Sequence, residues 1–106
     1  TKNNKKIIVN LAINYGSKNE ILNTLKKIKK KITVNNFEKN LYTKGMKFPD
    51  ILIRTGGHKR LSNFMLWQLS YSEIFFLNKL WPDFTPSDLL KIINKFRKIK
   101  RNFGGI

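Results

Sequence analysis

The residues with the clearest chemical potential lie between Asp50 and Phe64. An apolar run, Ile51 to Ile53, leads there into Arg54, Thr55, Gly56, Gly57, His58, Lys59, Arg60, Leu61 and Ser62. Two guanidinium groups six residues apart, two conformationally free glycines, hydroxyls and free backbone N–H groups can converge on an anion at the carboxyl end of a strand. The pattern predicts a diphosphate-binding loop. The alternative is a solvated turn with incidental arginines, and the residue types alone leave both open.

Two other charged features each have two interpretations. Glu73 starts an apolar segment, where its carboxylate could contact a metal or a substrate. The alternative is that Glu73 is an ordinary carboxylate at a strand end, paired with a nearby lysine, and spacing alone favours this second interpretation. The lysine-rich run from Lys26 to Lys31 is best read as the solvated face and last turn of a helix, where cations complement the helix dipole. Its alternative is a patch for nucleic acid or anionic lipid.

The net charge of +16 would ordinarily indicate nucleic-acid binding, because clustered cations release counterions from a phosphate backbone. However, 18 of the 22 basic residues are lysine, and asparagine and isoleucine number 13 each. Lys, Asn and Ile rising together indicate compositional drift rather than a binding face. A basic RNA-binding protein with pI near 10.4 therefore stays only as a competing hypothesis, and no nucleic-acid partner is expected.

The rest of the composition bounds the class of protein. Its 106 residues can bury one modest core, and the chain does not begin with Met, so a fragment of a longer domain is expected. There is no Cys to form disulfides or ligate a metal. Neither a bilayer-length apolar run nor a secretory signal at Thr1 to Lys6 is visible, so a cytoplasmic protein is expected.

The first half of the chain predicts a βα unit. Residues 7–14 are mostly apolar and rich in β-branched side chains, which is typical of a strand buried on both faces of a parallel sheet. Ser17 and Glu20 have the spacing of a capping box, and a helical stripe follows with its lysines on the opposite face: Ile21, Leu25, Ile28 and Ile32. A weaker helix over 34–42, a loop at 45–49 and a second buried strand at 50–54 come next.

The second half predicts three more elements. Residues 63–71 are apolar nearly all round, which favours a short helix wedged inside the protein or against a second subunit, and a third strand is predicted at 73–77. After an aromatic turn at 80–84, Thr85 caps the last helix, whose buried stripe is Leu89, Ile92, Ile93, Phe96 and Ile99. The order predicts an α/β fold with an open, mostly parallel sheet flanked by helices, whose ligands bind outside the carboxyl ends of the strands.

Several motifs together resemble the cis-prenyltransferase family, which includes undecaprenyl diphosphate synthases. The resemblance runs from about Val9 to Gly105. Its most specific parts are Asn14-Tyr15-Gly16, Asp50-Ile51-Leu52-Ile53-Arg54-Thr55-Gly56-Gly57, Arg60-Leu61-Ser62-Asn63-Phe64 with Trp67-Gln68, Tyr71-Ser72-Glu73, Leu80-Trp81-Pro82-Asp83-Phe84, and Arg101 to Gly105. Residues 1–106 are accordingly expected to be the C-terminal part of a cis-prenyltransferase domain.

The resemblance implies an enzyme that condenses isopentenyl diphosphate onto an allylic diphosphate such as farnesyl diphosphate, adding cis double bonds. It implies Mg²⁺ as cofactor, a homodimer, an apolar tunnel for the growing chain, and peripheral contact with a membrane through the lipid product. Arg54, Arg60 and Ser62, with Leu61 in the same run, match the positions that bind isopentenyl diphosphate. Glu73 matches the carboxylate that helps to hold magnesium. Guanidinium groups suit a multiply charged diphosphate, and Mg²⁺ takes one or two carboxylates beside phosphate oxygens.

The sequence also departs from the family pattern. The catalytic aspartate of the family lies in an N-terminal Asp-Gly-Asn segment that these residues do not contain, since the only aspartates are Asp50, Asp83 and Asp88; the isolated polypeptide is therefore expected to be inactive.

His58 stands where an acid is usual, and the resemblance favours a solvent-facing or phosphate-adjacent residue over an acid–base role. Asn102 replaces the second of two arginines that reach toward the partner subunit, and Lys18 replaces another arginine. These changes leave open a non-catalytic prenyltransferase-like subunit.

Overall fold

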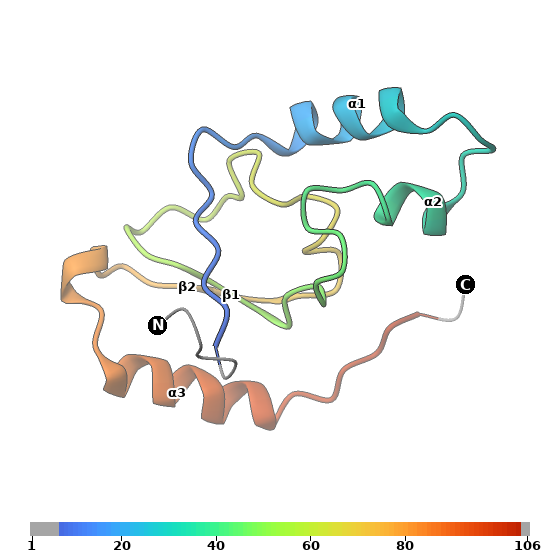
Figure 1. Ribbon diagram of the computed structural model, residues 1–106. Coiled ribbons are helices and arrows are strands. Elements are labelled where there is room, and N and C mark those ends of the chain that lie inside the picture. The colour runs from blue at the N-terminus through green and yellow to red at the C-terminus, as the bar shows by residue number, and fades with distance from the viewer. Residues whose placement is uncertain (1–6, 105–106) are drawn as a thin grey trace.

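The structure is a computed structural model that describes residues 7–104. In chain order the elements are helices α1 (Ser17–Lys27) and α2 (Val34–Glu38), strands β1 (Ile51–Arg54) and β2 (Glu73–Phe76), a 3₁₀ turn at Trp81–Asp83, and helix α3 (Pro86–Arg97). Figure 1 shows α1 and α2 together at one side of the molecule, α3 at the opposite side, and the strand pair between them.

The sheet of the described residues is a parallel pair. Ile51 of β1 lies opposite Glu73 of β2, and Arg54 lies opposite Phe76. The predicted α/β class, the parallel pairing and both strand positions are confirmed to within a residue. Because parallel strands end at the same edge, Arg54 and the residues after it lie beside the chain that leaves β2.

The prediction of a buried strand over residues 7–14 is wrong for the described structure. This segment is neither helix nor strand, and its five large apolar side chains are 73–83% exposed. A strand needs a neighbour to satisfy its backbone groups, and no described segment pairs with this one.

Helix α1 buries a polar face rather than the predicted apolar stripe. Its N-cap is Gly16, so the predicted capping box between Ser17 and Glu20 is wrong. Glu20 is fully buried, and its carboxylate accepts hydrogen bonds from the Tyr42 N–H at 2.8 Å and the Gln68 amide at 3.0 Å. A buried carboxylate requires hydrogen-bond donors, and these distant residues supply them. The helix therefore buries its polar face instead of its apolar stripe.

Residues 63–71 form a chain of turns, so the predicted helix there is wrong. Asn63 and Met65 have positive φ angles of 62° and 46°, which a right-handed helix does not allow. The predicted burial is confirmed only at Gln68 and Leu69, while Phe64, Leu66 and Tyr71 are at least 36% exposed.

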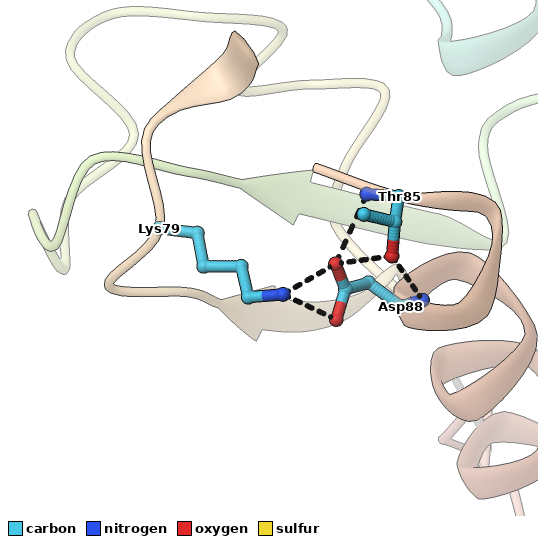
Figure 2. Close-up of polar contacts among 3 residues, drawn as sticks. All are labelled: Lys79, Thr85 and Asp88. Carbon is cyan, nitrogen blue, oxygen red and sulfur yellow. Dashed lines mark hydrogen bonds and ion pairs between the residues drawn. The ribbon is translucent and has the colours of Figure 1, made fainter. Parts of the chain in front are cut away.

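Helix α3 begins as predicted. The Thr85 hydroxyl accepts a hydrogen bond from the Asp88 N–H, and the Asp88 carboxylate accepts one from the Thr85 N–H at 3.0 Å, which completes a capping box. Figure 2 shows the Lys79 ammonium group on the same carboxylate, 2.8 Å from its nearer oxygen. This lysine and the Thr85 cap lower the pKa of Asp88 to about 2, so the carboxylate is ionised at neutral pH. Of the predicted α3 stripe, Ile92 alone is fully buried.

The core of the described residues is small. Its fully buried apolar side chains are Phe37, Leu41, Leu69 and Ile92. The radius of gyration is 16.1 Å, against about 13 Å for a compact domain of this length. Many apolar side chains therefore stay on the surface. No helix of residues 7–104 is both long enough and apolar enough to cross a bilayer.

Candidate functional site

The loop after β1 is shaped by its two glycines. Gly56 and Gly57 have φ angles of 87° and 75°, which side-chain-bearing residues rarely adopt. The Gly56 N–H donates to the carbonyl of Lys79 at 2.7 Å, and the Gly57 N–H donates to the carbonyl of Leu77 at 2.9 Å. These two amides are thus used to hold the loop against the chain beyond β2. They are not free to bind an anion, contrary to the expectation from the sequence.

The side chains of the arginine loop, defined here as residues 54–62, converge. The Arg54 guanidinium donates through Nη1 to the Ser62 hydroxyl oxygen at 3.1 Å and to the carbonyl of Arg60. Because Ser62 accepts this bond, its own O–H proton can point toward a bound ligand. Arg54 is half-buried, whereas the Arg60 side chain is exposed.

A cavity of about 210 Å³ opens beside the loop. It is lined by Leu52, Ile53, Arg54, Arg60, Leu61 and Phe64. Three of the four predicted substrate-binding residues, Arg54, Arg60 and Leu61, therefore share one cavity, and the fourth, Ser62, is hydrogen-bonded to Arg54. The other three lining residues, Leu52, Ile53 and Phe64, were not predicted from the sequence, although they lie just before and just after the charged run.

Glu73 lies apart from this cavity. It begins β2 opposite Ile51, and its N–H donates to the carbonyl of Asp50 at 2.9 Å. Three residues of strand separate this end from the Arg54 end, a distance of about 10 Å. The structure thus unites the arginine-loop residues without bringing Glu73 to them.

The donor set for a magnesium ion is incomplete in this arrangement. Among residues 7–104 no three His, Asp, Glu or Cys side chains lie close enough to hold a metal ion together. The carboxylate of Asp50, the residue whose carbonyl accepts the Glu73 N–H, is paired with Arg101 at 2.5 Å. The described residues therefore do not fit a magnesium ion at the arginine loop by themselves, and the role of Glu73 stays a prediction.

The residues that depart from the family pattern lie outside the cavity. His58 is exposed in the turn after the glycines. Arg101 donates to the carbonyl of Tyr71 at 3.0 Å and lies 4.6 Å from the ring centre of Phe103, so the segment containing Asn102 folds back on its own chain. A cavity of about 530 Å³ lies between this segment and the body.

Comparison with known proteins identifies the family of the chain. Residues 1–104 match the prenyltransferase family described as "Putative undecaprenyl diphosphate synthase". The isoprenyl transferases of Oceanobacillus iheyensis and Prochlorococcus marinus are 44% and 47% identical over 116 aligned positions, which cover all of this chain and 46% and 43% of those proteins.

Two solved structures are also similar. Lavandulyl diphosphate synthase from Lavandula x intermedia, in complex with dimethylallyl diphosphate, has a TM-score of 0.79 and 39% identity over 86% of this chain and 44% of its own. A probable undecaprenyl diphosphate synthase from Campylobacter jejuni has a TM-score of 0.78 and 38% identity over 88% of this chain and 45% of its own. The chain spans less than half the length of these relatives. Fold, motifs and matches agree, and the chain belongs to the undecaprenyl diphosphate synthase family of prenyltransferases.

Proposed function

We propose that this chain carries the isopentenyl diphosphate site of a cis-prenyl chain-elongating enzyme, as the C-terminal part of its catalytic domain. The observation that carries the proposal is the shared cavity beside the arginine loop, where Arg54, Arg60 and Leu61 meet. Support also comes from the lavandulyl enzyme, which was captured with an isoprenoid diphosphate.

The cavity combines the two chemistries that this substrate needs. The two guanidinium groups can neutralise a diphosphate with paired hydrogen bonds, and the Ser62 hydroxyl can add a donor. Leu52, Ile53 and Phe64 supply an apolar wall for a five-carbon isopentenyl group. In the reaction the isopentenyl double bond forms a carbon–carbon bond to the allylic carbon, the allylic C–O bond breaks and releases inorganic diphosphate, and a proton is lost from the isopentenyl unit. This chain's part is to bind and orient the isopentenyl diphosphate.

Three further features belong to the proposal. Glu73 is the carboxylate that we assign to Mg²⁺, and the described residues supply only part of the ligand set for this ion. A homodimer is proposed on the family resemblance. So is a cytoplasmic enzyme that meets a membrane only through its lipid product.

The direct test is Arg60→Ala in the full-length protein. Removing one charged partner of a bound phosphate costs about 2–5 kcal/mol, so the KM for isopentenyl diphosphate should rise steeply. Arg97→Ala, the same substitution at an exposed position of α3, is the matched control and should leave this KM unchanged. Equal kinetics for the two variants would overturn the proposal.

A non-catalytic prenyltransferase-like subunit is the second candidate, favoured by His58 and Asn102, which differ from the family pattern. It predicts that the full-length protein binds isopentenyl diphosphate weakly or not at all and produces no polyprenyl diphosphate. Isothermal titration with isopentenyl diphosphate, followed by product analysis, separates the two functions.

A further inference from the structure

The start of helix α1 is capped by a residue that lies far away in sequence. The Ser17 N–H donates to the Asn63 carbonyl at 2.8 Å, and the Lys18 N–H donates to the Asn63 side-chain oxygen at 2.9 Å. These are two of the four N–H groups that every helix leaves without a partner in its first turn. Asn63 therefore does for α1 what an N-cap side chain normally does.

The N-cap position itself explains why an external cap is used. Gly16 has no side chain, and a Cβ atom placed there would lie 3.0 Å from the Asn63 amide nitrogen. The place of a local capping side chain is thus taken by Asn63. A second hydrogen bond also joins the first turn of α1 to the segment after the arginine loop, because the Leu66 N–H donates to the Ser17 hydroxyl at 3.0 Å.

The capping residue is the immediate neighbour of the arginine loop. Ser62 and Asn63 both have positive φ, 50° and 62°, a conformation that non-glycine residues hold only when their surroundings enforce it. Ser62 in turn accepts the hydrogen bond from Arg54. A continuous chain of contacts therefore runs from the start of α1 through Asn63 and Ser62 to the Arg54 guanidinium.

We infer that Asn63 is a positioning residue: by capping α1 it fixes the backbone that presents Ser62 and Arg54 to the isopentenyl diphosphate. Asn63 does not line the cavity and need not contact the ligand. The inference rests on the proposed function of the arginine loop. It assigns to α1 the role of a fixed support for that loop.

The test compares Asn63→Ala, Asn63→Asp and Thr33→Ala in the full-length protein. Thr33→Ala is the matched control, because the Thr33 side chain caps α2 by accepting from the Asn36 N–H at 3.1 Å, away from the arginine loop. Asn63→Ala should raise the KM for isopentenyl diphosphate by on the order of ten-fold, with the KM for the allylic diphosphate unchanged. Asn63→Asp keeps the acceptor oxygen and should restore most of the loss, whereas Thr33→Ala should lower the melting temperature and leave both KM values unchanged.

A KM for isopentenyl diphosphate that rises no more in Asn63→Ala than in Thr33→Ala would overturn the inference. If Asn63→Ala does not fold, Gly16→Ala decides, because its new methyl group must push the Asn63 amide by a few tenths of an ångström. That variant should raise the same KM by roughly two- to five-fold, and an unchanged KM would refute the role. Arg60→Ala separates the two proposals: if it changes the KM and the Asn63 variants do not, only the positioning role fails.

Discussion

The two ends of the strand pair carry opposite kinds of chemistry. At the carboxyl end of β1, the Arg54 guanidinium is held by Ser62 and by the Arg60 carbonyl, beside a cavity. At the amino end, the Glu73 N–H donates to the Asp50 carbonyl, and the Asp50 carboxylate is already paired with Arg101. The cationic site is therefore held together by contacts within its own loop, whereas at the acidic end the Asp50 carboxylate pairs with Arg101 of the C-terminal segment.

The largest effect should come from the guanidinium that holds the cationic end together. Arg54→Ala removes the positive charge that would bind the diphosphate, and it also removes the hydrogen bonds from Arg54 to Ser62 and to the Arg60 carbonyl. We expect kcat/KM for isopentenyl diphosphate to fall by the equivalent of a rise of about 2–5 kcal/mol in activation free energy. The loss should be larger than in Arg60→Ala. Steady-state kinetics on the full-length protein measure this. A larger loss in Arg60→Ala would mean that the Arg54 contacts do not organise the loop.

The glycine turn should rank next. Gly57→Ala forces a side chain into φ 75°, at a cost of about 1–2 kcal/mol in unfolding free energy. Gly45→Ala is the matched control, because Gly45 has φ 78°, with nothing within 4 Å of an added Cβ. Both variants should unfold at lower urea concentration, and only Gly57→Ala should also weaken isopentenyl diphosphate binding. Weakened binding in both would show that strain anywhere in the chain reaches the cavity.

The ion pair at the acidic end should contribute less. The Asp50 side chain is 68% exposed, so we expect Asp50→Asn to lower the unfolding free energy by only about 0.2–1 kcal/mol. Arg101→Ala should cost more than Asp50→Asn, because it also removes the contacts with Tyr71 and Phe103. Urea unfolding of the two variants tests this order, and equal losses would assign the whole effect to charge.

The smallest effect should come from the ion pair between Lys79 and Asp88, which lies next to the glycine turn. Lys79 accepts the Gly56 N–H through its carbonyl and pairs with Asp88 through its ammonium group (Figure 2). The pKa of Asp88 falls from 3.8 to about 2 on folding, so the folded state holds its proton less tightly than the unfolded chain. Its stabilisation should be complete above pH 4 and disappear as the pH falls toward 2. The difference in stability between the wild type and Asp88→Asn should shrink over that interval, and a constant difference would contradict the assignment.

Elements with strong local signals were predictable from the sequence. Three features depend mainly on neighbours within a few residues: the strand at 51–54, the strand at 73–76 and the Thr85 cap. The place of the arginine loop at the carboxyl end of β1 was also predictable, because the loop directly follows the apolar run 51–53.

Features that depend on distant partners were not predictable. The polar face of α1 is buried because Tyr42 and Gln68 supply donors to Glu20. The turns at 63–71 begin with Asn63, whose φ angle is positive and which caps the distant helix α1. Residues 7–14 had every local property of a strand except a pairing partner among the described residues. Local periodicity carries no information on such partners.

The close approach of Gly16 and Asn63 has an energetic consequence. In an Asn63→Ala background the amide that crowds a methyl group at position 16 is absent. The loss of substrate affinity in the double variant Gly16→Ala/Asn63→Ala should therefore be smaller than the sum of the losses in the two single variants. Positions 47 residues apart in the chain would then behave thermodynamically as one unit.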